Sequence, residues 1–268
     1  MLELFHHDLS VCAQKVRLCL EEKELKWESR YVDLAKREQK RPEYLKINPN
    51  GNVPTLVHDG NVVYESTIIN EYVDDAFPVK PLRPADALGK ARVRKWTLQL
   101  DVSVHMAMRT LNTAVFTRHR DMENHTEAEI EEKLSTIADP AKREHKITSF
   151  KQGIESPYIL DALERYSKLI KDMEAELADG RPWLVGDHFT LADVGFASYF
   201  TMLEGLQIGW LWEKSPRFSE WFQRLKARPA YERAITKWTE ASKDAARRIE
   251  YGKRVRDRMI EIFNARGT

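Results

Sequence analysis

The sequence predicts an α/β domain followed by an all-α domain, and two observations carry this prediction. The hydrophobic periodicity changes repeatedly in the first part of the chain, as it does where strands and helices alternate, and it is helical in the rest. Between the two patterns, Pro78, Pro81 and Pro84 lie close together, which is typical of a linker. We therefore expect a first domain over residues 1–80 and a second domain over residues 88–268.

The composition is that of a globular protein. The chain has 268 residues, of which 42% are hydrophobic, and 43 Lys and Arg face 42 Asp and Glu. Two cysteines exclude a disulfide scaffold, and the near-neutral charge argues against sequence-independent binding of nucleic acid. No apolar stretch approaches the roughly 20 residues that span a bilayer, and the N-terminus lacks the pattern of an export signal. We expect a cytoplasmic protein with no nucleic-acid or membrane partner.

In the first domain the expected elements follow the order βαβαββα, which is that of a thioredoxin-like domain. The last two strands flank Asp59-Gly60, a dipeptide typical of a type I′ hairpin turn. In chain order we expect a strand at 2–5, a helix at 11–22, a strand at 27–32, one or two helical turns at 41–47, strands at 55–58 and 61–64, and a helix from residue 66.

The second domain is expected to be helical throughout. Trp96, Leu100, Val104 and Met108 recur every four residues along one face of a long helix. The highly charged stretch over about 119–157 is expected to be a helical insertion. Further helices are expected at 158–177, at 191–204, around residues 221 and 231, and in the tail from about residue 240.

Thr190-Leu-Ala-Asp193 has the pattern of a capping box, in which a hydroxyl and a carboxylate bind the free N–H groups at the start of a helix. This structural role accounts for Asp193. We therefore do not assign it as a catalytic acid.

Three features of the first domain suit the binding of a peptide-like ligand, and Val53-Pro54 is the first. A proline directly before a strand is a candidate cis peptide, which would turn the N–H and C=O groups of Val53 outward. Those groups could pair with an extended peptide as an added strand does. From the dipeptide alone an ordinary trans bond is favoured.

The second feature is Glu65-Ser66 at the start of a helix. Ser is a good N-cap, the free N–H groups there bind a carboxylate, and a neighbouring acid can hold an ammonium group. The pair therefore suits the head group of an α-amino acid. A plain serine cap beside a solvated Glu is the simpler interpretation of the dipeptide by itself.

The third feature is Ser10, immediately before the first helix. Its hydroxyl could donate a hydrogen bond to a ligand sulfur, and the positive end of the helix would favour a thiolate over a thiol, whose free pKa is about 8.5. As an isolated residue, Ser10 would be only a cap.

Taken together, these residues resemble the cytosolic glutathione transferases. The resemblance covers nearly the whole chain and rests on the order and spacing of four motifs: Ser10-x-Cys12-Ala-x-Lys-Val-Arg-Leu18, Asn48-Pro-x-Gly-x-Val-Pro54, Glu65-Ser66-x-x-Ile-x-x-Tyr72 and Thr190-Leu-Ala-Asp193. It implies an N-terminal thioredoxin-like domain followed by an all-helical glutathione-transferase C-terminal domain, which matches the division above. It also implies glutathione as the cofactor and a homodimer, although heterodimers with a related subunit occur in the family.

The resemblance further implies a role for individual residues. Val53, next to Pro54, would pair with the cysteinyl backbone of glutathione, Glu65 and Ser66 would hold the γ-glutamyl head, and Ser10 would stabilise the thiolate. Arg41 and, more weakly, Asn52 occupy positions where relatives contact glutathione. A basic residue such as Arg41 suits the net negative charge of this ligand.

Ser10 stands where some members of the family carry a catalytic Ser and others a Cys, so thiol-exchange chemistry is not implied at that position. Cys12 is the alternative catalytic residue, because a cysteine at the start of a helix is acidified. We favour a role for Cys12 as a small apolar filler. Cys12 and Cys19 lie about 10 Å apart along one helix, too far to form a disulfide.

Within the family, the run from Glu65 to Pro78 and the charged insertion are similar to the bacterial β-aryl etherases that act on lignin-derived aromatic ketones. The resemblance implies that the thiolate attacks the carbon bearing an aryloxy group and expels a phenol. We expect an aromatic small-molecule substrate in a pocket lined by His7, Leu9, Val104, His105 and Met108.

Two other functions stay open: a transferase, lyase or isomerase acting on another electrophile, and a non-catalytic binding module with the same fold. The retained Ser10, Val53-Pro54 and Glu65-Ser66 count against a binding module. His6-His7-Asp8 suggests a metal site, but adjacent strand residues point to opposite faces and no companion ligand motif is present. We therefore predict no metal.

Overall fold

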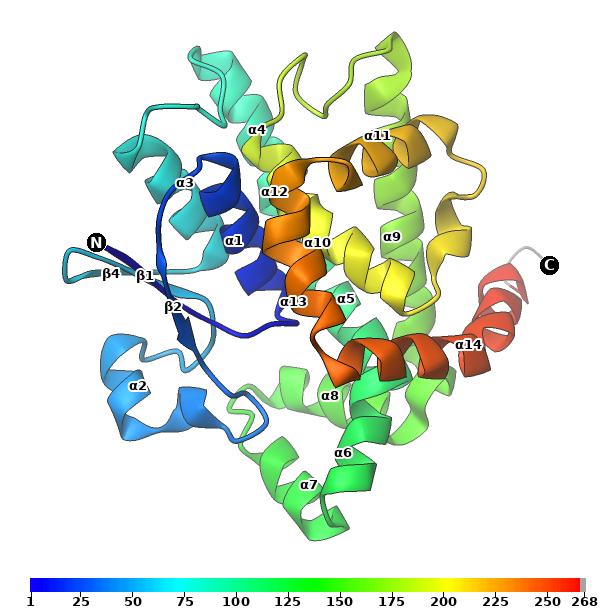
Figure 1. Ribbon diagram of the computed structural model, residues 1–268. Helices are drawn as coiled ribbons and strands as arrows, with labels where there is room; N and C mark the ends of the chain where they lie inside the picture. The colour runs from blue at the N-terminus through cyan, green and yellow to red at the C-terminus, as the bar shows by residue number, and fades with distance from the viewer. Residues whose placement is uncertain (266–268) are drawn as a thin grey trace. The chain divides into compact units, whose positions relative to one another are not determined.

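The structure is a computed structural model that describes residues 1–265 (Figure 1). These residues form two compact units that are interleaved along the chain. Unit 1 comprises residues 1–101, 176–200 and 219–242, and unit 2 comprises residues 102–175, 201–218 and the part from 243 onward. The domain limits near residues 80 and 88 describe the change in sequence pattern, and they stay a prediction.

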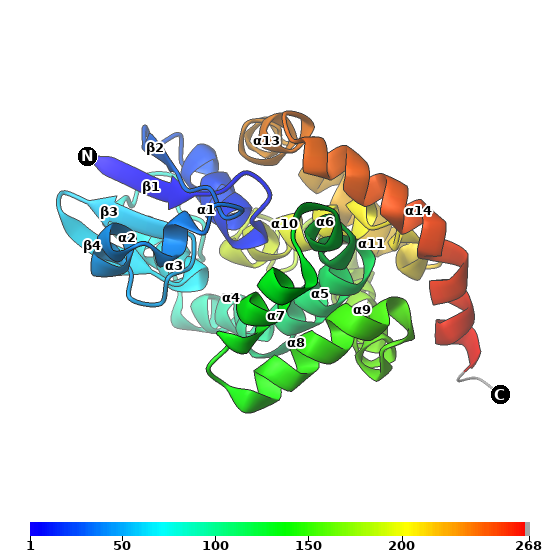
Figure 2. The same cartoon turned by 90° about the horizontal axis from the view of Figure 1, so that it is seen from below.

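The sheet of unit 1 has four strands, β1 (Leu2–His6), β2 (Glu28–Tyr31), β3 (Thr55–His58) and β4 (Asn61–Tyr64), in the order β2-β1-β3-β4 (Figure 2). Strand β1 pairs parallel to β2 and antiparallel to β3, and β3 pairs antiparallel to β4. Asp59 and Gly60 join the last two strands with φ angles of 48° and 81°. Positive φ at both residues is what the predicted type I′ turn requires.

Three helices and one short turn complete the predicted βαβαββα order: α1 (Val11–Glu22), η1 (Glu38–Lys40), α2 (Pro42–Ile47) and α3 (Ser66–Ala76). Helices α1 and α3 pack against each other. Their apolar faces and the inner residues of β1 and β3 are fully buried and form the core beside the sheet: Leu4, Val16, Leu18, Leu20, Leu56, Ile69 and Val73. The predicted thioredoxin-like fold, followed by helices, is confirmed.

Helical segments from later in the chain also belong to unit 1. They are α4 (Ala87–Gln99), η5 (Leu177–Asp179), the first part of α10 (Leu191–Gly205), the later part of α11 (Pro216–Lys226), α12 (Pro229–Tyr231), η7 (Glu232–Thr236) and α13 (Lys237–Glu240). Segments α12 and η7 pack against α1, and Figure 1 shows α12 and α13 beside it.

The capping box at the start of α10 is confirmed. The carboxylate of Asp193 accepts hydrogen bonds from the Thr190 N–H at 2.9 Å and from the Thr190 hydroxyl at 3.0 Å. Its other oxygen accepts from the Leu184 N–H at 3.0 Å and from the Trp221 indole N–H at 2.9 Å. Asp193 is fully buried. Its carboxylate is therefore a structural junction, as its position in the sequence predicts.

The long helix predicted through residues 96–108 is a succession of helical segments that includes two π-helical turns. After α4 follow η2 (Leu100–Val104), α5 (His105–Asn112), η3 (Thr113–Thr117) and α6 (Arg118–Asn124). Segments η2 and η3 are the π-helical turns. The repeat of every four residues at Trp96, Leu100, Val104 and Met108 thus crosses a π-helical turn, where the helix is wound more loosely.

The rest of unit 2 is helical, as expected: α7 (Glu127–Ser135), α8 (Pro140–Gln152), η4 (Gly153–Glu155), α9 (Pro157–Glu176), η6 (Gly209–Trp212) and the tail helix α14 (Lys243–Asn264). The predicted insertion contains a small apolar cluster of Ile130, Leu134 and Phe150, flanked by Ile137 and Ile147. Across residues 1–265, no helix combines the length and apolar character that crossing a membrane demands.

Candidate active site

Ser10 caps the N-terminus of α1, as predicted. Its backbone is extended, with φ −71° and ψ 114°, and its Oγ accepts a hydrogen bond from the Ala13 N–H at 3.3 Å. The Ser10 N–H donates to the His7 carbonyl at 3.3 Å. The side chain is partly exposed at the positive end of a twelve-residue helix. Its oxygen already accepts an N–H, so its hydroxyl proton is available to an acceptor outside the helix.

The Val53-Pro54 peptide bond is cis, so the trans bond that the dipeptide alone favours is wrong. Strand β3 begins only at Thr55. Within residues 1–265, the N–H and C=O groups of Val53 make no hydrogen bond. An extended peptide could therefore pair with this segment by adding a strand.

Two buried side chains hold the turn that leads to Val53. The Tyr44 hydroxyl donates to the Asn52 carbonyl at 2.6 Å, and the Asn48 side-chain amide donates to the same carbonyl at 3.2 Å. Gly51 has φ +57°, and a Cβ there would come within 2.9 Å of the Gln39 carbonyl oxygen. The turn therefore requires glycine at position 51, and its anchoring fixes where Val53 lies.

Glu65 and Ser66 lie at the start of α3, with one difference from the prediction. Glu65, not Ser66, occupies the N-cap position, and Ser66 is the first helical residue and is buried. Glu65 has φ +69°, a left-handed value that is strained for any residue with a Cβ. Its exposed carboxylate accepts from the Asn50 side-chain amide at 3.2 Å. Strain of this kind is held where the surrounding structure or a ligand requires it.

Arg41 and Asn52, the two weaker predictions, are both exposed. Arg41 precedes α2, and its guanidinium lies 3.2 Å from the Glu38 carboxylate. The Asn52 Oδ1 accepts from the Asn48 side-chain amide at 3.0 Å. The structure leaves a face of both side chains open to solvent, and their role in binding stays a prediction.

Lys15 is a buried base to which the sequence reasoning gave no role. Its ammonium is 1% exposed and donates to the Thr67 hydroxyl at 2.8 Å, which in turn donates to Asp101 at 3.1 Å. Burial lowers the pKa of Lys15, and the charges of Cys12, Asp101 and Glu65 oppose that shift. Lys15 thus places a positive group behind the residue pair that begins α3. The signal was present, because Lys15 and Arg17 are bases inside an otherwise apolar helix.

The surroundings of the two cysteines fit a packing role. The Cys12 Sγ lies 3.8 Å from the Tyr199 hydroxyl and is partly buried. Cys19 is fully buried, and burial raises the pKa of its thiol far above the ordinary value. Both thiols are free. The arrangement is that of an apolar filler at both positions, and no second cysteine of residues 1–265 completes a redox pair.

The predicted substrate pocket divides between the two units. His7 and Leu9 belong to unit 1, where His7 stacks on Tyr31 with ring centroids 5.6 Å apart. Val104 and Met108 are buried in unit 2, where His105 is partly buried. The pocket that these residues would form together stays a prediction.

The first histidine of His6-His7-Asp8 is fully buried. Its Nε2 lies 2.7 Å from the Ser29 hydroxyl and its Nδ1 lies 3.0 Å from the Arg17 guanidinium. Both ring nitrogens are therefore occupied by protein groups. Over the described part of the chain, no three His, Cys, Asp or Glu side chains converge as metal ligands would.

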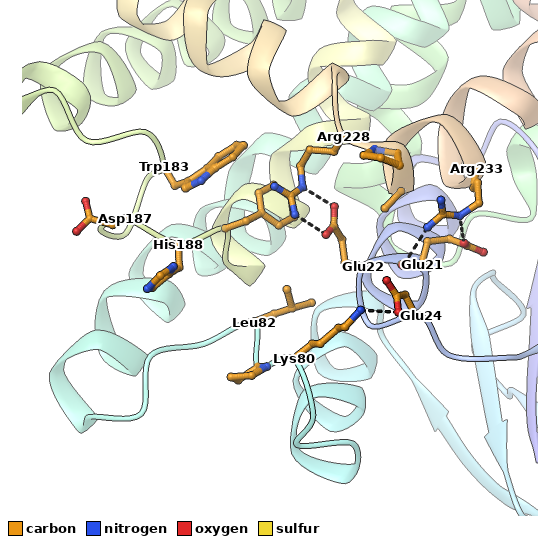
Figure 3. Close-up of a pocket in the computed structure, with 14 residues that line it drawn as sticks. Glu21, Glu22, Glu24, Lys80, Leu82, Trp183, Asp187, His188, Arg228 and Arg233 are labelled. Carbon is orange, nitrogen blue, oxygen red and sulfur yellow. Dashed lines mark hydrogen bonds and ion pairs between the residues drawn. The ribbon is translucent and has the colours of Figure 1, made fainter.

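A cavity of about 550 Å³ lies at the opposite, C-terminal end of α1 (Figure 3). Ion pairs line it: Glu22 with Arg228 at 2.6 Å, Glu21 with Arg233 at 2.7 Å, and Glu24 with Lys80 at 2.5 Å. Arg228 also lies over the ring of Phe189, 4.1 Å from its centroid. None of the predicted site residues borders this cavity, and its charges are satisfied within the protein.

Comparison with known proteins supports the site at the Ser10 end. Residues 9–76 match the family described as glutathione S-transferase, N-terminal domain, and residues 122–229 match glutathione S-transferase, C-terminal domain. Protein LigF of Sphingobium sp. (strain NBRC 103272 / SYK-6) is 31% identical over 245 residues, which cover 88% of this chain and 93% of LigF. Glutathione S-transferase 1 of Dianthus caryophyllus is 43% identical over 90 residues, which cover 34% of this chain and 41% of that protein.

Among solved structures, the crystal structure of the β-etherase LigF from Sphingobium sp. strain SYK-6 is similar to this one. Its TM-score is 0.76 and its sequence identity is 30%, and the match covers 88% of this chain and 99% of that one. Both families of residues that carry the predicted site, those before α1 and those between α2 and α3, fall inside the matched N-terminal region, except that the region begins at residue 9.

Proposed function

Because the chain belongs to the glutathione S-transferase family, we propose that it activates the thiol of glutathione and uses it to cleave β-aryl ether bonds of lignin-derived aromatic ketones. The observation that carries the glutathione site is the free main chain of Val53 beside the start of α3. The similarity to a β-etherase over nearly the whole chain supports the choice of electrophile.

Each part of glutathione has a matching group in unit 1. The cysteinyl N–H and C=O pair with the unoccupied main-chain groups of Val53. The γ-glutamyl carboxylate binds the free N–H groups at the start of α3, beside Ser66, and its ammonium binds the exposed carboxylate of Glu65. Arg41 supplies a cation for the remaining carboxylate of the tripeptide.

Ser10 activates the sulfur. The free thiol has a pKa of about 8.5, so most of it is protonated at neutral pH. The hydroxyl of Ser10 donates to the thiolate, and the N-terminal end of α1 favours the same negative charge. Both effects act on the charged form of the sulfur, so both lower the pKa of the bound thiol.

In the proposed reaction the thiolate attacks the carbon that bears the aryloxy group, next to the ketone. A carbon–sulfur bond forms as the carbon–oxygen bond breaks, and the aryloxy group leaves with the bonding electron pair and takes up a proton to become a phenol. The product is a glutathione thioether. Holding both reactants in one site supplies the effective concentration that the bimolecular step lacks in solution.

The proposal includes a homodimer in the cytoplasm, where glutathione is reduced. Large apolar side chains are exposed on three neighbouring elements of unit 1: Tyr64 of β4, Ile68 of α3 and Leu98 of α4. Ile68 and Leu98 are 57% and 58% exposed, which supports a face that a second subunit covers. A related subunit would fit the same face in a heterodimer.

The test is incubation of the protein with glutathione and each enantiomer of a β-aryl ether ketone, with chromatography of the phenol and the thioether. We expect equal amounts of both products from at least one enantiomer and none without glutathione. Retention on immobilised glutathione is measured in parallel. A protein that is retained but releases no phenol would acts on another electrophile, and a protein that is not retained would contradict both enzymatic functions.

A further inference from the structure

Arg17 is a fully buried guanidinium in the middle of α1. A buried charge is tolerated only when its donors are hydrogen-bonded. Its partners are the carbonyl oxygens of Ala234 at 2.8 Å, of Asp8 at 2.9 Å and of His7 at 3.3 Å, together with the His6 imidazole at 3.0 Å. None of these four groups is a carboxylate.

The imidazole partner is neutral. Arginine has only donors, so the Nδ1 of His6 accepts its hydrogen bond, and the Nε2–H donates to the Ser29 hydroxyl at 2.7 Å. Burial, followed by the charges of Arg17 and His7, lowers the pKa of His6 to about 3. The positive charge of Arg17 therefore has no adjacent counter-charge, and its partners only orient it.

An aromatic side chain closes this network. The ring of Trp238 lies over the Arg17 guanidinium, 4.7 Å from its centroid, and meets the His6 ring edge-on with centroids 4.8 Å apart. The Trp238 indole N–H donates to the Arg233 carbonyl at 3.1 Å. Together with the bond from Arg17 to Ala234, these contacts fasten α1 to the segment from η7 to α13.

Two of the four partners lead directly to Ser10. The His7 carbonyl accepts from Arg17 and also from the Ser10 N–H at 3.3 Å. The Asp8 carbonyl accepts from Arg17 and from the Gln14 side-chain amide at 3.3 Å. The two peptide groups that precede the Leu9-Ser10 step are thus held by one guanidinium.

We propose that Arg17 is a positioning residue that holds the His7–Asp8 backbone, so that the Ser10 hydroxyl and the first turn of α1 point at the sulfur of the bound thiol. This inference rests on the proposed function, because it needs a glutathione thiolate at Ser10. It assigns no contact between Arg17 and glutathione. Arg17 acts through the backbone that it fixes.

The test compares Arg17→Lys with Arg228→Lys. Arg228 also anchors α1 through a bidentate pair with Glu22, at 2.6 Å for both bonds, but at the other end of the helix (Figure 3). Lysine keeps each charge and loses the forked set of donors. The readouts are the pKa of bound glutathione, from thiolate absorbance against pH, the KM for glutathione, kcat with a β-aryl ether ketone, and the thermal unfolding midpoint.

For Arg17→Lys we expect the pKa of the bound thiol to rise by about one unit, with a roughly tenfold loss of kcat below that pKa and a KM for glutathione within about twofold of the unmodified protein. For Arg228→Lys we expect a lower unfolding midpoint with no change in the thiol pKa. In a Ser10→Ala background, Arg17→Lys should change the thiol pKa by much less, because its effect passes through Ser10.

Three results would overturn the inference: an unchanged thiol pKa in folded Arg17→Lys, an equal shift in Arg228→Lys, or full additivity with Ser10→Ala. If Arg17→Lys does not fold, Trp238→Leu decides, since it removes the ring that covers Arg17 and should raise the thiol pKa in the same direction. No bound thiolate in the unmodified protein at any pH would instead contradict the proposed function.

Discussion

The two ends of α1 treat charge in opposite ways. At the N-terminal end the buried Arg17 is met by carbonyl oxygens and a neutral imidazole. At the C-terminal end the buried Lys23 meets the Asp74 carboxylate at 2.9 Å, and Arg83 meets the same carboxylate at 2.8 Å. One end leaves a positive charge without a counter-charge, and the other pairs every buried charge.

This difference follows the chemistry expected at each end. The N-terminus of a helix is positive, and an unneutralised arginine behind it adds to the potential that favours a thiolate. The C-terminus is negative, and there Lys23, Lys80, Arg228 and Arg233 offset both the helix and the acids Glu21 to Glu24. We conclude that one end of α1 is arranged for activation of a ligand and the other for stability.

The largest effect is expected at the C-terminal end, from Asp74→Asn. This change leaves the buried Lys23 and Arg83 without their carboxylate, and losing one partner of a buried ion pair costs about 3–5 kcal/mol. Urea unfolding at pH 7 measures the loss. Asp75→Asn is the control, because Asp75 also pairs with Arg83 but is exposed, and exposed pairs contribute up to about 1 kcal/mol. Equal losses for the two variants would contradict the comparison.

The next effect is expected at the N-terminal end, from Ser10→Ala. Removing the donor to the thiolate should lower kcat/KM near neutral pH by about 100-fold, as for other donors that stabilise a reacting anion. The pKa of bound glutathione should rise, which thiolate absorbance measures. Ser10→Thr keeps a hydroxyl at the helix cap and should retain most of the activity. An inactive Thr variant with normal glutathione binding would argue against the hydroxyl as the active group.

A third prediction concerns acid. The folded pKa of His6 is lowered to about 3, below the value of about 6.5 that an unfolded histidine has. The unfolded chain therefore takes up a proton first, so stability is complete above pH 6.5, falls as the pH drops below it, and goes on falling until the folded His6 protonates. The expected slope is about 1.4 kcal/mol per pH unit. NMR titration of the His6 ring checks this, and a midpoint near pH 6.5 would contradict it.

The smallest effect is expected from Cys12→Ala, beside Ser10 on α1. Because Cys12 packs against Tyr199 and is assigned no role with the sulfur, kcat and the KM for glutathione should each change by less than about twofold, within the range of a modest core truncation. Steady-state kinetics at pH 7 measures both. Loss of activity in this variant, with activity retained in Ser10→Ala, would reverse the assignment of the two residues.

Periodicity and turn chemistry predicted most of the fold from the sequence. The bounds of α1 and of the β3–β4 hairpin are those expected, because an apolar helix face after a serine cap and an Asp-Gly turn between alternating strands have few other solutions. Ser10 and the Val53 segment were predicted for the same local reasons.

Other features lay outside those rules. Periodicity treats a base as a surface residue, so the burial of Lys15 and Arg17 could not be predicted, since it depends on partners distant in the sequence such as Ala234. The left-handed backbone of Glu65 was missed because that conformation is ordinarily assigned to glycine or asparagine. The compact units could not be read from the linker prolines, because segments after residue 176 return to unit 1.

The π-helical turns η2 and η3 have a consequence for engineering this protein. Each loosened turn accommodates one more residue than an α-helix needs, and a one-residue change in an α-helix rotates everything after it by about 100°. Deleting a residue within η2 would tighten the turn while turning His105, Met108 and the rest of α5 to a new face. The length of this helix is therefore a separate variable from the identity of its side chains.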